Sequence, residues 1–320
     1  MSASTSVLSR YAKRLVPAAG NEGWVSSVAV DSSGNVLTAS SGPPNTAQVE
    51  KFSASGSLLW IDQFGSTSGG SADSGSVATD AAGNVYVGGG FSGTVNFNPS
   101  GTHNVTAGPN TNGFVLQLTS AGKFGWVSPF TSQNSAASSS ANSLAVDGNG
   151  NVDVGGYYVG SVDFSTGRHA VTLPYTVSGG NTYGGGFIVQ LNSSGSLVWA
   201  QQAGNGWSGV DHLALDSSGN IYVEGTFQGP STGGPSQTQI GTDTFTCQGS
   251  TDIFVAEWSA SDTFQWAASI DGSSEQQPTG IAVDSSGNVD IGGWGSTPLY
   301  YDETNPITLQ SGPYFVIQLT

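Results

Sequence analysis

One short segment occurs five times along the chain, and this repetition limits the fold more than any other feature. In each copy an apolar run of the Val-Ala-Val type leads into Asp, two small residues, Gly, Asn and a second apolar run. After a first step of 49 residues, the copies follow one another at intervals of 67 to 69 residues. Such a period indicates a structural unit that buries its apolar side chains only by packing against copies of itself. The turn aspartates are Asp31, Asp80, Asp147, Asp216 and Asp284.

Each unit contains four short runs rich in β-branched and aromatic residues, and Gly, Ser, Asn and Asp separate them. This is the pattern of short strands joined by tight turns. We name the expected strands A to D in chain order. Strand C reads Phe-Val-x-Gln-Leu or a close variant, as at residues 114–118, and strand D carries a Trp, as at Trp126. The sequence therefore predicts an all-β fold of repeated four-stranded antiparallel sheets.

The two ends of the chain together complete the fifth repeat. The last copy stops after strand C, and residues 6–17 have the character of the missing strand D. A closed ring leaves no exposed sheet edge, whereas a linear solenoid does. We therefore predict one five-bladed β-propeller over residues 1–320, closed by the N-terminal strand. The expected blades are about 24–65, 74–130, 141–203, 210–270, and 278–320 together with 6–17.

The repeat motif also resembles a known family. Its elements are Val-Asp-x-x-Gly-Asn-Val-Tyr-Val-Gly-Gly, Gly-Thr-Val-Asn-Phe-Asn-Pro and Gly-Phe-Val-x-Gln-Leu-x-x-x-Gly-x-Leu-x-Trp, best matched at residues 77–126 and 144–199. This pattern resembles the bacterial SBBP-type β-propeller repeats, which are seven-bladed-propeller-like. The resemblance implies a propeller of a large secreted or surface protein, and it implies no particular activity.

Charge and composition exclude several classes of protein. With 6 basic and 22 acidic residues, the chain has too few cations to neutralise nucleic-acid phosphates. No apolar run is long enough to span a membrane, and the single Cys247 cannot form an intramolecular disulfide. A low charge content with abundant Ser, Thr, Asn and Gly is typical of extracellular or cell-surface proteins. The sequence starts without a signal peptide. We expect a monomer.

Loop variation indicates where a ligand would bind. The A–B and C–D turns are short and nearly alike, whereas the D–A and B–C connections differ from blade to blade. In a propeller these two sets lie on opposite faces. Variable loops on a rigid scaffold commonly carry binding sites, so we expect a site on the loop-rich face near the central channel.

Three polar residues of the fourth unit break the repeat. Asp211 and His212 precede the apolar run of strand A where other copies hold small or uncharged residues, and Glu224 lies in strand B where most copies hold Gly or Ala. A carboxylate beside an imidazole is a candidate acid–base pair or metal-ligand set. The alternative is a hydrogen-bonded polar pair that faces channel water.

Aromatic and acidic residues of the loops suggest a sugar-binding surface. Trp24 and Trp207 lie in matching Gly-Asn-x-Gly-Trp or Gly-Asn-Gly-Trp segments. Aromatic rings stack on pyranose faces, and neighbouring polar groups bond sugar hydroxyls. The alternative is that these aromatics cover the ends of neighbouring blades. The candidate ligand-binding residues are Trp24, Trp207, Glu22, Glu275, Tyr158 and Trp294.

One segment faintly resembles a calcium loop. Asp147 and Asp153 flank alternating Asn and Gly residues, which places oxygen ligands at alternate positions. Because the turn recurs in every unit, a structural role for its Asp explains the pattern better. The sequence requires no cofactor, and calcium is the one ion that it leaves open.

These observations lead to three functional hypotheses. The first is a secreted or cell-surface binding or adhesion propeller with a small-molecule or glycan ligand near the channel. The second is a glycosidase-like or metal-assisted hydrolase that uses carboxylates and His at the channel mouth, by analogy with other five-bladed propellers. The third is a structural spacer without a ligand.

Overall fold

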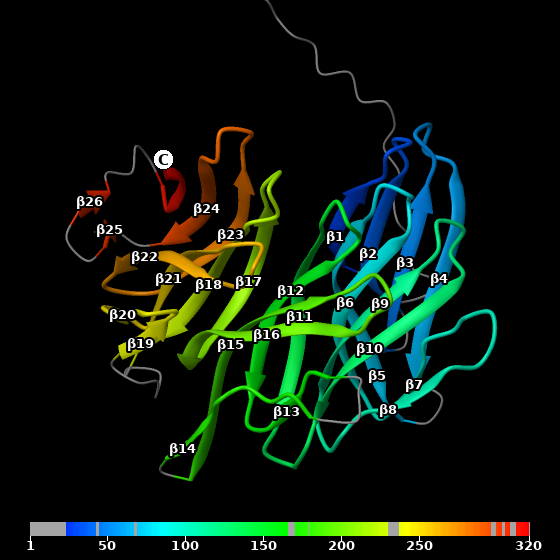
Figure 1. The fold of residues 1–320 in the computed structure, drawn as a ribbon, viewed down its shortest axis with the longest axis horizontal. Coiled ribbons are helices and arrows are strands. Elements are labelled where there is room, and N and C mark those ends of the chain that lie inside the picture. The colour runs from blue at the N-terminus through cyan, green and yellow to red at the C-terminus, as the bar shows by residue number, and fades with distance from the viewer. Residues whose placement is uncertain are drawn as a thin grey trace, which may run out of the picture.

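The computed structural model describes residues 24–42, 45–66, 69–165, 170–178, 180–229, 237–295, 299–302, 305–307 and 312–319. These residues form β-strands and their connections, without a helix among them. Every strand pair named below is antiparallel, so the all-β expectation is confirmed. Figure 1 shows the strands grouped into successive sheets that follow the chain.

Five sheets, which we call blades 1 to 5, each pair their strands in chain order from A to D. Blade 5 has three such strands among the described residues. Blade 1 consists of β1 (Val25–Val30), β2 (Val36–Gly42), β3 (Thr46–Phe52) and β4 (Leu58–Ser66), and blade 2 of β5 (Ser71–Thr79), β6 (Val85–Ser92), β9 (Asn112–Leu118) and β10 (Phe124–Ser132). Blade 3 consists of β11 (Ser138–Val146), β12 (Val152–Val159), β15 (Asn181–Leu191) and β16 (Leu197–Gly206), and blade 4 of β17 (Ser208–Leu215), β18 (Ile221–Gln228), β21 (Thr251–Trp258) and β22 (Phe264–Gly272). Blade 5 consists of β23 (Gln276–Val283), β24 (Val289–Gly295) and β27 (Tyr314–Leu319).

The first strands of neighbouring blades lie side by side. Strand β1 contacts β5, β5 contacts β11, β11 contacts β17, and β17 contacts β23. Strand A is therefore the innermost strand of each blade, as expected for a propeller. This order brings the residues that begin each strand A together around the centre of the molecule.

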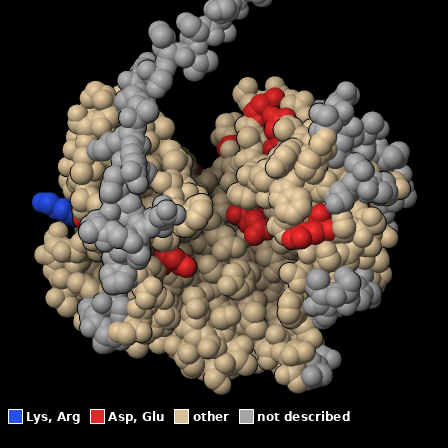
Figure 2. Space-filling view, turned by 180° about the vertical axis from the view of Figure 1, so that it is seen from behind, with Lys and Arg blue, Asp and Glu red and all other residues tan. Residues whose placement is uncertain are grey.

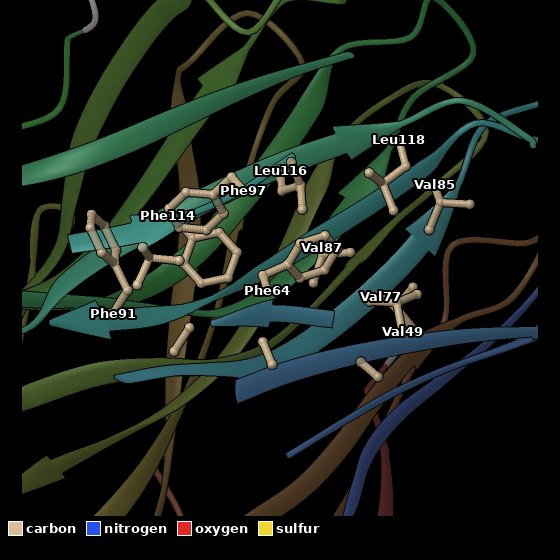
Figure 3. Packing of buried hydrophobic residues seen from close by; sticks show 14 of the residues in the cluster. Val49, Phe64, Val77, Val85, Val87, Phe91, Phe97, Phe114, Leu116 and Leu118 are labelled. Carbon is tan, nitrogen blue, oxygen red and sulfur yellow. The ribbon is translucent and has the colours of Figure 1, made fainter. Parts of the chain in front are cut away.

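The hydrophobic core lies between the blades. Val49 of blade 1 shares a buried cluster with Val77 and Leu116 of blade 2, and Figure 3 shows Val49 next to Val77 within this cluster. The same arrangement recurs between the later blades. Burying one such side chain contributes about 1.5–3 kcal/mol, so each blade depends on its neighbour for stability.

A turn of the same geometry joins strands A and B in all five blades. In blade 4, Oδ1 of Asp216 accepts the N–H groups of Ser218 and Asn220 at 2.8 and 2.9 Å, and Oδ2 accepts Nδ2 of Asn220 at 2.8 Å. The Gly between them adopts a φ between +78° and +86° in all five turns, which Gly tolerates without strain. The bonds from Asn recur at Asp31, Asp80, Asp147 and Asp284.

The long B–C insertions reach back to the preceding blade. Strands β7 (Thr94–Asn96) and β8 (Asn104–Thr106) extend blade 1 beyond β4, and β13 (Val162–Asp163) pairs with β10 of blade 2. These insertions therefore lie beside strand D of the preceding blade. The remaining short strands are β14 (Thr176–Ser178) on β15, the β19 (Gln237–Ile240) and β20 (Asp243–Thr246) hairpin near β16, and β25 (Leu299–Tyr301) and β26 (Asn305–Ile307) beside β22.

Blades 1 and 5 have no strand pairing between them among the described residues. Val28 on β1 is 60% exposed and Val316 on β27 is 78% exposed. Their counterparts at the inner blade contacts, such as Val77 and Val115, are buried. The predicted closing strand at residues 6–17 lies outside the described residues.

Candidate functional site

Every strand A contains one β-bulge. The register with strand B skips one residue, which is Asp211 in blade 4 and Asn142 in blade 3. A bulge leaves that residue outside the ladder and redirects its side chain. In blade 3 the Asn142 side chain donates Nδ2 to the carbonyl of Val210 in the next blade, at 3.1 Å. Asp211, one of the three residues of the fourth unit that break the repeat, is therefore the bulged residue of its strand.

The Asp211 carboxylate is largely buried at the bulge of β17. Its Oδ2 accepts the hydroxyl of Thr226 on the neighbouring strand β18, at 3.2 Å. Burial raises the pKa of Asp211, and the proximity of His212 and the bond from Thr226 offset part of that rise. This carboxyl group is held in place and only partly solvated, which suits it to bind a polar ligand group.

Asp211 lines a pocket of about 490 Å³ between blades 3 and 4. Aromatic rings form much of its wall: Trp207 is 43% exposed, Tyr157 is 40% exposed, and the rings of Tyr183 and Trp207 lie 6.2 Å apart at an interplanar angle of 50°. Asn142, Thr226 and Gln228 add polar groups. The full lining is Asn142, Tyr157, Tyr158, Val159, Thr182, Tyr183, Gly184, Gly206, Trp207, Ser208, Gly209, Asp211, Thr226 and Gln228.

Tyr158 belongs to the pocket wall, but its hydroxyl serves the scaffold. The side chain is almost completely buried, and its hydroxyl donates to the carbonyl of Pro174 and accepts Nε2 of Gln202. Of the sequence-predicted binding residues, Tyr158 and Trp207 thus meet at this pocket together with Asp211.

Sequence reasoning missed Tyr183. It lies in a Gly-rich stretch before the Phe-Val-x-Gln-Leu motif, and β15 extends over 11 residues to include it. The other strands C have 6 to 8 residues. The extra length of β15 brings Tyr183 to Trp207, and the irregular spacing before residue 187 is the one signal that could have revealed it.

His212 and Glu224 form a cross-strand pair in blade 4. Nδ1 of His212 lies 3.5 Å from Oε2 of Glu224, and the Glu224 side chain has no exposed surface. Burial raises the pKa of Glu224 to about 7, although the proximity of His212 and of the backbone N–H of Gly280 lowers it. Glu224 does not line the pocket. The structure thus brings Asp211, His212 and Glu224 near one another. Of the three, Asp211 lines the pocket, and Glu224 has no exposed surface.

The remaining predicted binding residues are spread elsewhere. Trp24 is 77% exposed, and its carbonyl accepts the N–H of Ser41, whereas that of Trp207 accepts the N–H of Gln228. By strand register Ser41 corresponds to Thr226, so the two matching Trp segments are offset by two residues. Glu22 lies outside the described residues, and Glu275 and Trp294 do not line the pocket.

The candidate calcium ligands are bound to protein groups. Oδ1 of Asp147 accepts the N–H groups of Asn149 and Asn151, and Oδ2 accepts Nδ2 of Asn151, each at 2.8 Å. Asp153 is buried and accepts Nε2 of Gln190 at 2.9 Å. Burial raises the pKa of Asp153 to about 7. Within the described ranges, no three His, Cys, Asp or Glu residues gather as a metal-binding group.

Two of the strand D Trp residues bond to the next blade, whereas Nε1 of Trp266 donates to Glu257 of its own blade at 2.6 Å. Nε1 of Trp60 in blade 1 donates to the carbonyl of Ser120 in blade 2, at 3.2 Å. Nε1 of Trp126 in blade 2 donates in the same way to Ser193 of blade 3, at 3.1 Å. These two Trp residues therefore link blade 1 to the C–D turn of blade 2, and blade 2 to the C–D turn of blade 3.

Comparison with known proteins places the chain among repeat proteins. It is 26% identical over 282 residues to an uncharacterized WD repeat-containing protein of Acanthamoeba polyphaga mimivirus, a match that covers 74% of this chain and 20% of that protein. The chain thus spans about a fifth of the length of this relative. A solved structure of a protein of unknown function from Bacteroides caccae is similar at a TM-score of 0.34 and 12% identity, over 78% of this chain and 82% of that one.

No family model matches the chain, so its resemblance to the SBBP-type repeats stays a prediction. In the part of the chain that is described, no helix has the length and apolar character needed to cross a membrane. The WD-repeat relative and the successive antiparallel sheets agree in architecture, because WD repeats build β-propeller blades. The chain is a β-propeller-like repeat protein.

Proposed function

We propose that this protein is a binding module that holds a sugar in the pocket between blades 3 and 4. The observation that carries the proposal is the convergence of Trp207, Tyr157 and Tyr183 with Asp211 at one pocket of about 490 Å³. This volume suits a small organic ligand, and pockets of this kind combine apolar walls with a few placed polar groups.

The pocket offers the two kinds of contact that sugars need. The exposed faces of Trp207 and Tyr157 can stack on the C–H face of a pyranose ring. Asp211 and Gln228, which also line the pocket, can bond its hydroxyl groups. The low charge and polar composition of the chain support a role at the cell surface or outside the cell.

Hydrolysis is less well supported by this geometry. A glycosidase needs two carboxyl groups that flank the scissile bond. Asp211 lines the pocket, but Glu224 has no exposed surface and is paired with His212. We therefore propose binding as the activity, and we assign Glu224 to the contact between blades 4 and 5.

Binding can be tested with a glycan array followed by calorimetry on the sugars that score. We expect Trp207→Ala to abolish binding and Trp24→Ala to leave it unchanged, because Trp24 is exposed but does not line the pocket. Trp24→Ala is thus the matched control for Trp207→Ala, because each variant loses one exposed loop Trp. An array without signal for folded protein would support the spacer hypothesis, and release of reducing sugar would support the hydrolase.

We further propose that blades 1 and 5 meet to close a five-bladed ring, with residues 6–17 as the fourth strand of blade 5. Val115 of blade 2 shares a buried cluster with Leu144 of blade 3, and Ile188 of blade 3 does so with Leu213 of blade 4. Val316 and Val28 hold the corresponding positions on the two ends. Their exposed apolar surface would be buried by this contact.

A disulfide tests the closure directly. In the Val28→Cys, Val316→Cys variant we expect an intramolecular disulfide to form under mild oxidation, visible as a shift in non-reducing electrophoresis. The native thiol should not interfere, since Cys247 is buried and its pKa is raised to about 12. Free thiols in the monomer, or disulfide-linked oligomers alone, would contradict closure within one chain.

A further inference from the structure

We infer that the pocket between blades 3 and 4 selects an amino sugar, whose protonated amine binds at Asp211, over neutral and acidic sugars. This inference rests on the proposed sugar binding and goes beyond it by naming the ligand's charge. It is carried by the electrostatics of the loop-rich face and by the aromatic groups beside Asp211.

One carboxylate lines the pocket, and a second one lies near its wall. Asp211 lines it from blade 4, and Asp73 of blade 2 lies near Tyr157 in its wall. Burial raises the pKa of the Tyr157 hydroxyl, and the negative charge of Asp73 raises it further. In Figure 2, Asp and Glu side chains border the hollow at the centre of the molecule.

No described basic side chain balances these acids. Among the described residues the Lys and Arg set consists of Lys51 and Lys123. Lys51 is buried in an ion pair with Asp31 at 2.9 Å, and Lys123 belongs to a C–D turn, on the opposite face from the pocket. The Lys and Arg atoms visible in Figure 2 lie at the outer edge of the molecule.

A cationic ligand would interact favourably with both the Asp211 carboxylate and the aromatic rings of the pocket. The Asp211 carboxylate has lost much of its hydration, so an ammonium group would regain a charge-assisted hydrogen bond there. The faces of Trp207, Tyr157 and Tyr183 favour a cation close to them. A neutral sugar can use only the stacking contacts and hydrogen bonds from its hydroxyl groups, without the attraction between two opposite charges, and a uronic acid would be repelled by Asp211.

The experiment compares three soluble sugar oligomers of equal length by calorimetry: glucosamine, N-acetylglucosamine and a uronic acid. We expect the glucosamine oligomer to bind at least about tenfold more tightly than the acetylated one, as one charge-assisted bond provides. We expect no binding of the uronic acid oligomer. The glucosamine preference should also shrink as salt rises, because salt screens the attraction.

Asp211→Asn removes the charge with little change in shape, and blade 3 already holds Asn142 at the same bulge. We expect this variant to bind both oligomers within about twofold of each other. Asp243→Asn, which makes the same charge change away from the pocket, should keep the preference. The salt dependence is measured on the wild-type protein, so a folding defect in a variant cannot affect that result.

The outcomes separate the two proposals. Equal affinity of wild-type protein for the glucosamine and acetylated oligomers would overturn the charge selection and leave sugar binding intact. A preference that survives both high salt and Asp211→Asn would also overturn it. Absence of binding to every sugar by folded protein would overturn the proposed function itself.

Discussion

Nδ1 of His212 lies 3.5 Å from Oε2 of Glu224, at a cross-strand position that differs in the other blades. In blades 2 and 3 the same position pairs Ser76 with Gly88 and Ser143 with Gly155. The Ser hydroxyls there accept an N–H from the next blade, from Leu144 and Leu213 respectively, at 3.1 Å. Blade 4 replaces this neutral contact with a pair in which the Glu224 carboxylate has no exposed surface and the His212 side chain is 38% exposed.

Glu224→Gln should make stability less dependent on pH. The pKa of Glu224 rises from 4.5 to about 7 on folding, so the unfolded chain releases its proton first as pH increases. The folded state therefore loses stability between about pH 4.5 and pH 7, by up to roughly 3 kcal/mol. Gln cannot ionise, so urea unfolding should show the variant more stable than the wild type at pH 8 and similar to it at pH 4.

The control for this effect is Glu275→Gln, because Glu275 is an exposed carboxylate. Its free energy of unfolding should change by less than about 0.5 kcal/mol at either pH. If the Glu224→Gln variant and the wild type kept a constant difference from pH 4 to pH 8, Glu224 would not titrate in this range.

Ser143→Ala should weaken the contact between blades 3 and 4. The hydroxyl of Ser143 accepts the N–H of Leu213, and its removal leaves that donor without this bond. We expect a loss of about 1 kcal/mol, the usual cost of one such hydrogen bond. Urea unfolding measures this loss of stability. The control is Ser218→Ala, which should have almost no effect, because Ser218 bonds to Asp216 through its backbone N–H and keeps that bond in the variant. Equal effects of the two variants would argue against the link between blades.

Asp147→Ala should destabilise the fold through its turn and independently of calcium. The side chain accepts three hydrogen bonds from the turn, and their loss should cost about 1–2 kcal/mol. We expect the same drop in melting temperature in calcium and in chelator, and no rise for wild-type protein on adding calcium. A calcium-dependent rise that Asp147→Ala removes would instead establish a metal site.

The repeat could be predicted from the sequence because its determinants are local. Asp216, Gly219 and Asn220 fix the A–B turn within five positions, so the strand order of each blade follows from the motif. The pocket depends on contacts between distant segments. Tyr183 meets Trp207 only because β15 is extended, and the side-chain direction of Asp211 depends on a bulge.

The offset of Trp24 from Trp207 has the same origin. Similar segments precede both residues, but the number of residues between each Trp and its turn aspartate differs, so the register places them at different heights. The return of the B–C insertions to the preceding blade was also beyond local patterns, since β7 and β13 pair with strands far away in the sequence.

Val28→Ala and Val77→Ala together measure whether the ring is closed. Both residues occupy the same position of strand A, but Val77 is buried against blade 1, whereas Val28 is 60% exposed at the end of the series. Val77→Ala should cost about 2 kcal/mol from lost burial and the cavity it leaves. If blade 5 covers Val28 in solution, Val28→Ala should cost a similar amount in urea unfolding. A change below about 0.5 kcal/mol would mean that blades 1 and 5 stay apart.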